Sequence, residues 1–259
     1  MAEVPEFGAM LASLLGRREV RVRDVAASAR LNADGIRAVL SGESPSTELV
    51  RRLASALGFH AVDLLILAGL EVPSDLEPLD PAAELWVPRI VTEAVHLKAA
   101  GRGEVLHLVR SLPQEERTGV FVPQRLHPLS SAPGNRIIRM LRYRNLSWSG
   151  LAKTMAVLTP TYLAASTFGR IGADRKELTP RLVIDFSALL GIEAGELAAM
   201  TGVVLPGIPP PPPPEAQDAA ALLWEARRLS AEQAEYVAAL ARSMRGDSRN
   251  GYTLNLPGS

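Results

Sequence analysis

Apolar residues recur every three or four positions along most of the chain, which is the spacing that places them on one face of an α-helix. In the N-terminal part this pattern fills five short stretches, each bounded by Gly, Ser, Asn or Pro: residues 7–15, 22–31, 34–40, 48–57 and 61–70. Strict alternation of apolar and polar residues is scarce, and Thr118–Gln124 is the only plausible short strand. The pattern therefore predicts an all-α protein.

The pattern also repeats within the chain. Residues 56–73 align with residues 189–206 without a gap, and the alignment matches Gly58 with Gly191, Ala61 with Ala194, Leu64 with Leu197, Gly69 with Gly202 and Pro73 with Pro206. After a shift of one residue, residues 93–110 align with residues 225–242, which matches Glu93 with Glu225 and Arg110 with Arg242. We interpret this as a tandem duplication. Each copy is expected to hold about five short helices, a proline-containing connector and a longer amphipathic helix.

A chain of 259 residues exceeds the usual size of one domain, so two domains are expected. The predicted organisation is copy 1 at residues 1–113, a linker at 114–134, a diverged copy 2 at 135–246 and a tail at 247–259. Six consecutive prolines, Pro209–Pro214, are expected to form a stiff extended spacer of roughly 19 Å, in preference to a ligand for a signalling domain.

Composition narrows the classes of function. The chain has no cysteine, which excludes disulfides, thiolate metal sites and cysteine nucleophiles. It shows no signal peptide and no apolar stretch near the roughly 20 residues that span a bilayer, so a cytoplasmic, nucleoid-associated protein without membrane contact is expected. The formal net charge is zero, but residues 17–52 and 136–178 are basic. These blocks are either two anion-binding surfaces or ordinary solvated helix faces.

Motifs for catalysis are scarce. The sequence has no phosphate-binding glycine loop, no nucleophile elbow and no paired histidine motif. Glu93 and His96 have the Glu-x-x-His spacing of helix-bundle di-iron sites, but the second copy has Glu-Ala-Arg-Arg at 225–228, so a paired site would lack its other half. We therefore predict no catalytic residue, no metal and no cofactor, and hence a protein that is not an enzyme.

Residues 22–65 (VRDVAASARLNADGIRAVLSGESPSTELVRRLASALGFHAVDLL) resemble the helix-turn-helix of the lambda repressor and Cro family, also called the xenobiotic-response-element type. The resemblance rests on an apolar and turn frame: Val25, Ala26, Leu31, Ile36, Val39, Gly42, Pro45, Leu53, Ala54, Leu57 and Gly58. The second copy resembles the family through Leu151, Ala152, Met155 and Leu163, with one extra residue at the turn and about seven more in the loop at 169–178. The resemblance implies two lambda-repressor-like domains in one chain.

The resemblance also implies which residues contact double-stranded DNA, because the opening of the third helix meets base edges while the second helix and the following loop hold phosphates. In copy 1, Asn32 would cap the third helix and Ala33, Asp34 and Arg37 would face the groove; Arg21, Arg23, Ser44 and Ser46 would hold phosphates. Asp34 would be repelled by phosphate unless it accepts a hydrogen bond from cytosine. In copy 2, Thr159 would cap the third helix, Thr161 and Tyr162 would project hydroxyls, and Arg139, Lys153 and Arg170 would contact the backbone.

The expected function is therefore that of a bacterial DNA-binding transcriptional regulator. Its two copies would act as a pseudo-dimer with third helices about 34 Å apart, or one copy would be degenerate. The long helices could also mediate a homodimer or hold a protein partner. The competing hypothesis is a non-enzymatic interaction scaffold built on degenerate helix-turn-helix domains.

Overall fold

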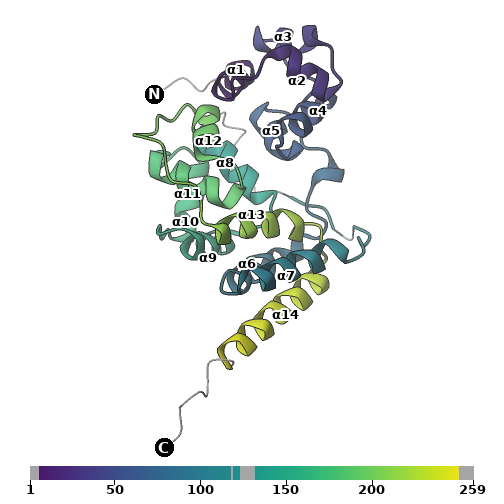
Figure 1. The fold of residues 1–259 in the computed structure, drawn as a ribbon, viewed down its shortest axis with the longest axis vertical. Coiled ribbons are helices and arrows are strands. Elements are labelled where there is room, and N and C mark those ends of the chain that lie inside the picture. Colours follow the sequence, from purple (N-terminus) through teal and green to yellow (C-terminus); the bar gives the residue numbers. More distant parts are fainter. Residues whose placement is uncertain (1–5, 118, 123–131, 251–259) are drawn as a thin grey trace, which may run out of the picture. The chain divides into compact units, whose positions relative to one another are not determined.

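The computed structural model describes residues 6–117, 119–122 and 132–250 (Figure 1). Within these residues the chain forms fourteen α-helices and two short 3-10 helices and no strand, which confirms the all-α class. Residues 119–122 of the expected strand at Thr118–Gln124 form no regular structure. Residues 118, 123 and 124 lie outside the described residues.

The first five helices occupy the five stretches that the apolar pattern predicts. They are α1 (Phe7–Arg17), α2 (Val22–Ala29), α3 (Ala33–Leu40), α4 (Thr47–Leu57) and α5 (Ala61–Leu67). Their buried positions follow the helical period, with Ile36, Val50 and Leu53 fully enclosed. Side chains and glycine fix the ends, since Asn32 and Ser46 cap α3 and α4 and Gly58 closes α4 in the left-handed conformation.

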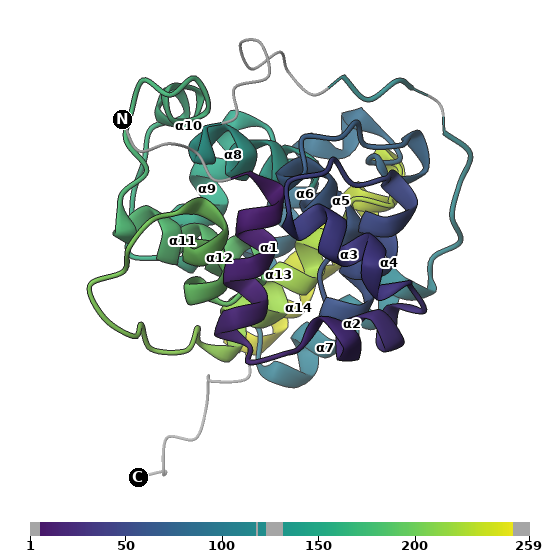
Figure 2. The same ribbon diagram turned by 90° about the horizontal axis from the view of Figure 1, so that it is seen from above.

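The chain divides into two compact units, and each draws segments from both halves of the sequence. Unit 1 comprises residues 1–77, 123–143 and 166–211. Besides α1 to α5 it contains α8 (Pro133–Arg142), α11 (Pro180–Leu190), α12 (Ala194–Thr201) and nearly all of α10 (Ala165–Gly172). Within this unit α1 packs on α12 and α5 packs on α8; α1 and α12 lie side by side in both ribbon views (Figure 2).

Unit 2 comprises residues 78–122, 144–165 and 212–259. Its helices are α6 (Val87–Ala94), α7 (Ala99–Ser111), α9 (Trp148–Leu158), α13 (Pro214–Ala226) and α14 (Ala231–Asn250). Here α6 packs on α9, α13 and α14, and α7 packs on α13 and α14. The two units thus combine corresponding segments of the predicted copies, whereas the predicted division into residues 1–113 and 135–246 follows the order of the sequence. Residues 118 and 123–131 of the predicted linker lie outside the described residues.

The trailing part of each predicted copy contains two helices, where the sequence pattern predicts one longer helix. In the second half the break falls between α13 and α14. Ser230 and Gln233 form a capping box there: the Gln233 N–H donates to Ser230 Oγ and the Ser230 N–H donates to Gln233 Oε1, both at 3.3 Å. This reciprocal pair starts a new helix and so ends the old one. In the first half α7 begins after Lys98.

The third helix of the second half also differs from the expectation. The sequence alignment places its start at Thr159, but α9 runs to Leu158, the next residues are non-helical and α10 begins at Ala165. Phe168 and Ile171, both fully buried, supply the apolar anchors of this helix, a role that the alignment gave to Leu163. The extra residues consequently lie in the turn between α9 and α10, while the loop after α10 is short.

Candidate nucleic-acid interface

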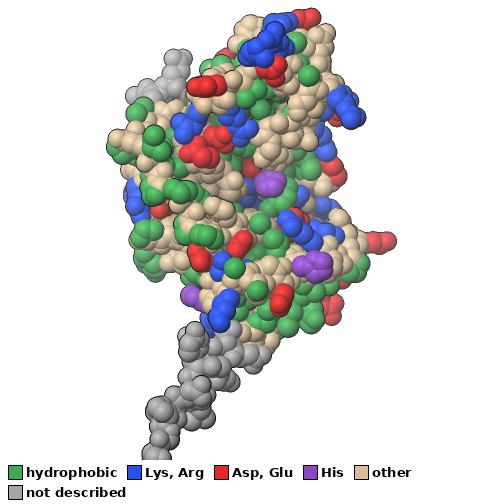
Figure 3. Space-filling view, viewed as in Figure 1, with side chains coloured by type: hydrophobic (Ala, Val, Ile, Leu, Met, Phe, Trp, Pro, Cys, Tyr) green, Lys and Arg blue, Asp and Glu red, His purple; other side chains and the backbone are tan. Residues whose placement is uncertain are grey.

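The residues predicted for the first copy all lie in unit 1, on α2, on α3 and in the loop that follows α3. Lys and Arg side chains gather beside Asp and Glu side chains over α2 and α3, at the top of the space-filling view (Figure 3). Arg21 precedes the first turn of α2 and Arg23 lies in it, and both are exposed. Residues Ile36 and Val39 of α3 face the core, which leaves the opposite face of that helix toward solvent.

Asp24 partly offsets the positive charge at the start of α2. Arg21 Nε donates to Asp24 Oδ2 at 2.8 Å, and Arg23 Nε lies 3.8 Å from Asp24 Oδ1. The hydrogen bond from Arg21, aided by the charges of Arg21 and Arg23, lowers the pKa of Asp24. These three side chains therefore carry one net positive charge, held at the N-terminus of a helix, where backbone N–H groups also attract anions.

Asn32 caps α3 as predicted. Its Oδ1 accepts a hydrogen bond from the Asp34 backbone N–H at 3.0 Å. The cap fixes the first turn of the helix. Ala33 lies half-buried in that turn, and Asp34 is exposed beside it.

The Asp34 carboxylate is ion-paired with Arg37, which offsets the repulsion from phosphate expected for it. Arg37 Nη1 donates to Asp34 Oδ1 at 2.5 Å, across one turn of α3. Both side chains are exposed, at 77% for Asp34 and 61% for Arg37. The pair as a whole has no net charge, so it neither attracts nor repels a phosphate strongly.

Ser44 and Ser46 occupy the loop between α3 and α4. Ser46 is the N-cap of α4, and its Oγ accepts a hydrogen bond from the Leu49 N–H at 3.2 Å. Ser44 is exposed, and Pro45 between the two serines is buried. Ser46 is thus held by its capping role but retains a hydroxyl hydrogen to donate, and Ser44 presents its hydroxyl to solvent.

Thr159, Thr161 and Tyr162 do not open a helix, which corrects the prediction for the second copy. The Thr159 hydroxyl donates to the Met155 carbonyl at 2.9 Å and accepts from the Thr161 N–H at 3.2 Å. These bonds end α9 and start a turn, and Pro160 has no N–H with which to continue the helix. Thr161 is half-buried, and Tyr162, 81% exposed, lies in the non-helical segment before α10.

The basic residues predicted for the second copy are distributed over both units. Arg139 is half-buried on α8 in unit 1. Burial raises the pKa of the neighbouring Tyr143, and the positive charge of Arg139 opposes that shift. Lys153 is exposed on α9 in unit 2, and Arg170 is exposed on α10 in unit 1. Neither unit therefore brings them together as unit 1 does for the first copy.

The first turn of α9, the helix that the repeat aligns with α2, is partly covered: Gly150 is buried, while Ser149 is exposed. A Cβ atom added at Gly150 would lie 2.6 Å from Pro88 Cγ on α6. Only glycine permits this close approach. Ser147 and Ser149 stand near the start of α9, whereas α2 starts with Arg21 and Arg23. The start of α9 is thus a packing surface within unit 2 and lacks the arginines of α2.

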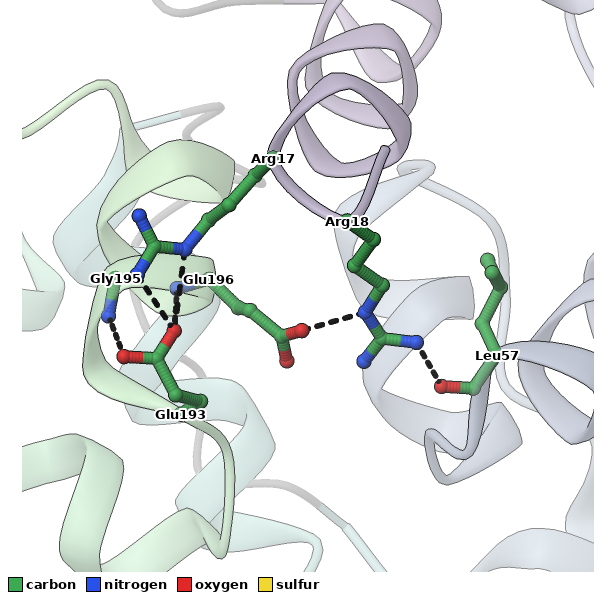
Figure 4. A network of polar contacts seen from close by, with 6 residues as sticks. All are labelled: Arg17, Arg18, Leu57, Glu193, Gly195 and Glu196. Carbon is green, nitrogen blue, oxygen red and sulfur yellow. Dashed lines mark hydrogen bonds and ion pairs between the residues drawn. The ribbon is translucent and has the colours of Figure 1, made fainter. Parts of the chain in front are cut away.

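Ion pairs bind most of the arginines in the basic block at residues 17–52. The pairs are Arg17 with Glu193, Arg18 with Glu196, Arg21 and Arg23 with Asp24, Arg37 with Asp34, Arg51 with Asp75 and Arg52 with Glu48. Arg17 and Arg18 connect α1 to α12, and Arg18 also donates to the Leu57 carbonyl at 2.6 Å (Figure 4). Much of this block therefore holds unit 1 together, a role that sequence spacing did not indicate for Arg17 and Arg18.

No matching family model, curated protein or solved structure was found for this chain. Among the described residues no group of three or more His, Asp or Glu side chains is placed to hold a metal ion. Glu93, of the Glu-x-x-His motif, is ion-paired with Arg245 at 2.7 Å. No helix in the described part of the chain combines the length and the apolar character needed to cross a bilayer.

Proposed function

We propose that this protein is a DNA-binding transcriptional regulator whose α2–α3 pair docks on the duplex. The observation that carries the proposal is the exposed surface of this pair, where Arg21 and Arg23 lie at the start of α2 and Asn32, Asp34 and Arg37 occupy the solvent-facing side of α3. An exposed helix N-terminus beside arginines suits phosphate, and an exposed first turn of the next helix suits base edges. The packing of α2 on α3 and α4 agrees with the lambda-repressor resemblance.

We also propose that the chain is a tandem duplication of a seven-helix unit. The fourth helices of the two copies, α4 at 47–57 and α11 at 180–190, differ by the same 133 residues at both ends. Their caps correspond as well: Ser46 accepts from the Leu49 N–H and Thr179 accepts from the Leu182 N–H. Matching cap, length and register in two segments so far apart support a common origin.

Backbone conformation supports the same duplication. A positive φ is uncommon for any residue except glycine, and where it occurs it marks a turn. In the described chain four such positions in copy 1 have a counterpart at the corresponding turn of copy 2: Glu19 with Asn145, Gly42 with Asp174, Gly58 with Gly191 and Gly69 with Gly202. Arg30 alone has none, and it lies in the turn where the extra residues of copy 2 fall. The turns are therefore repeated along with the helices.

Two glycines repeat a close helix contact. Gly8 and Gly134 are the second residues of α1 and α8. A Cβ atom on Gly8 would clash with the Val39 carbonyl oxygen of α3, and one on Gly134 would lie 2.7 Å from the Ile171 carbonyl oxygen of α10. Val39 and Ile171 are both the seventh residue of their helices. The first helix thus crosses the third in the same way in both copies.

Packing between the copies is reciprocal within each unit. In unit 1 the first helix of each copy packs on the fifth helix of the other, as α1 on α12 and α8 on α5. In unit 2 the sixth helix of each packs on the seventh of the other, as α6 on α14 and α13 on α7. Reciprocal contacts of this kind are the mark of a two-fold interface between identical subunits. They support the interpretation of a pseudo-dimer within one chain.

The copies are unequal for DNA binding, which supports the version of the prediction with one degenerate copy. In copy 2, Gly150 in the first turn of the second helix is buried against α6, and the third helix begins at Ala165, five residues after Pro160. Copy 1 keeps the corresponding surfaces exposed. We therefore assign docking to copy 1, and to copy 2 the role of its folded partner.

A salt-titrated binding measurement tests this function. The full chain should bind short duplexes at low salt, with a negative slope of log affinity against log salt concentration. Arg21→Gln with Arg23→Gln should make that slope shallower by about 0.9 for each phosphate that the variant no longer neutralises. Arg242→Gln, which removes an exposed charge from α14 in unit 2, serves as the control and should leave the slope unchanged. No binding at low salt, or equal effects of both variants, would contradict DNA binding through α2.

The second candidate function is an interaction scaffold. The ion pairing of the arginines favours it, because seven of the eight arginines at 17–52 lie within ion-pair distance of a carboxylate and the net positive charge offered to DNA is small. A chain that folds but binds no duplex at low salt would support the scaffold and overturn the regulator.

A further inference from the structure

The exposed pair of Arg37 and Asp34 has a geometry that suits the reading of one particular base. Arg37 uses Nη1 to donate to Asp34 Oδ1. Among the residues that the structure describes, Asp34 is its only hydrogen-bond partner. A guanidinium has five N–H donors, so the edge formed by Nε and Nη2 still offers two parallel donors.

Two parallel donors match one base in the major groove. Guanine presents the acceptors N7 and O6 there, and a bidentate arginine is the commonest specific contact to it. Adenine replaces one of these acceptors with an amine donor, and each pyrimidine presents a single hydrogen-bonding group. The open edge of Arg37 therefore selects guanine among the four bases.

Asp34 contributes by restricting the conformations of the Arg37 side chain, because it binds one end of the guanidinium. An arginine side chain loses considerable rotamer freedom when it binds, and a partner that already holds it reduces that loss. The carboxylate also cancels the positive charge of the guanidinium, so the pair gains little from a phosphate at any sequence. What remains is the hydrogen-bond pattern, which depends on the base.

We propose that Arg37 reads a guanine in the major groove and that Asp34 is its positioning residue, an inference that rests on the proposed DNA-binding function. The second copy lacks this pair. Helix α10 begins 132 residues after α3 in the sequence. At that offset Asp34 corresponds to Ser166 and Arg37 to Gly169. The binding site is therefore expected to hold one required G·C pair, which α3 of copy 1 contacts, and no second one related to it by symmetry.

Selection from a randomised duplex library with the full chain tests the inference. The wild-type protein should enrich sequences that share one invariant guanine. Arg37→Lys keeps the charge but removes the two parallel N–H donors. The slope of log affinity against log salt concentration should therefore stay the same, while the preference for guanine at that position should fall at least about fivefold. Asp34→Asn should weaken the same preference while leaving the affinity for random duplex equal or higher.

The controls separate reading from folding and from DNA binding in general. An exposed ion pair contributes little to stability, so the thermal midpoints of all three proteins should agree closely. If Arg37→Lys and Asp34→Asn enrich the same guanine as the wild-type chain, the assignment of Arg37 is overturned while the proposed regulator stands. If the wild-type chain enriches no sequence yet binds duplex, the reading role also fails. If it binds no duplex at all, the proposed function and this inference fail together.

Discussion

Gly8 is the residue on which the contact between α1 and α3 depends. Any side chain there would meet the Val39 carbonyl oxygen, and backbone atoms within a packed core cannot move aside cheaply. Gly8→Ala should therefore destabilise the protein by about 1–3 kcal/mol, as overpacked core substitutions do. Urea unfolding measures the difference.

Gly16, in the same helix, is the matched control for that prediction. It has nothing within 4 Å of an added Cβ and is exposed. Gly16→Ala should gain up to about 1 kcal/mol from helix propensity. Equal effects of the two alanines on the free energy of unfolding would show that α1 does not cross α3 closely at Gly8.

The same comparison in the second half tests the duplication. Gly134→Ala should destabilise, because the Ile171 carbonyl oxygen lies in the way, whereas Gly169→Ala on α10 enters open space and should be neutral or stabilising. Calorimetric midpoints of the two variants give the answer. A tolerated alanine at Gly134 would argue that the two copies do not share this helix crossing.

Some residue contacts could be predicted from the sequence and others could not. Asp34 with Arg37 and Glu48 with Arg52 lie three and four residues apart, a spacing that brings side chains together on a helix. The pairs of Arg17 with Glu193 and Arg18 with Glu196 join residues more than 170 positions apart. No local rule connects them, because they depend on which helix faces which.

At the scale of the element, the N-terminus of α12 offers a pH-dependent test. Glu193 caps this helix: its carboxylate accepts from the Gly195 and Glu196 N–H groups, each at 2.9 Å, and Arg17 lies 3.1 Å away. Burial alone would raise the pKa of Glu193, but the backbone hydrogen bonds and the Arg17 guanidinium together lower it. The ionised form is therefore favoured in the folded state.

The sign of the pH effect follows from that shift. A carboxyl group whose pKa is lower in the folded than in the unfolded state adds stability above its unfolded pKa and loses it as the pH falls through the folded pKa. Glu193→Gln should cost about 1 kcal/mol or less near neutral pH, in the range of a helix cap. Its thermal midpoint should begin to converge with that of the wild type as the pH falls below about 4.3, the ordinary pKa of glutamate, and should meet it only below the lowered pKa of the folded state.

Glu104→Gln is the control for this measurement, since Glu104 is exposed on α7 and loses the same charge. It should shift the midpoint little at any pH. A constant gap between wild type and Glu193→Gln across the acid range would mean that the carboxylate charge contributes nothing at this cap.

Helix boundaries show why the candidate site was only half predictable. Asn32 could be identified because a polar cap directly precedes an apolar helical period. Thr159-Pro160-Thr161 is compatible with a helix start, yet a threonine hydroxyl can equally bind the carbonyl four residues back, and that bond ends α9. Packing of α9 on α6 decides between the two, and it joins residues far apart in the sequence. The capping box at Ser230 and Gln233 was visible in the sequence and would have divided the last helix.

At the scale of the whole molecule, the reciprocal packing predicts that a cut between the copies does not separate them. Limited trypsin digestion after Arg117 or Arg125 should yield two fragments that elute together in size-exclusion chromatography. The reason is that α1 and α5 pack on helices of the second copy in unit 1, and α6 and α7 do so in unit 2. Elution as two separate fragments, each still helical, would show instead that residues 1–113 and 135–246 are independent domains.

The repeat that we propose is indicated by the sequence, but the sequence does not indicate how two copies would be arranged in space. Matched glycines and prolines suggest two copies because turns tolerate few residue types. They do not reveal which surfaces of the copies meet, since an apolar helix face packs equally well on its own copy or on the other. For this reason the sequence predicted a division by copy, whereas the compact units contain corresponding pieces of both.

The reciprocal packing has a consequence for how the protein would respond to its own abundance. A regulator made of separate subunits dissociates on dilution, so occupancy of its site rises with the square of the chain concentration when the chain is scarce. Two halves joined covalently stay at a high effective concentration of each other. Occupancy would then rise in simple proportion to the number of chains, and a cell holding only a few copies would still have every one of them ready to bind.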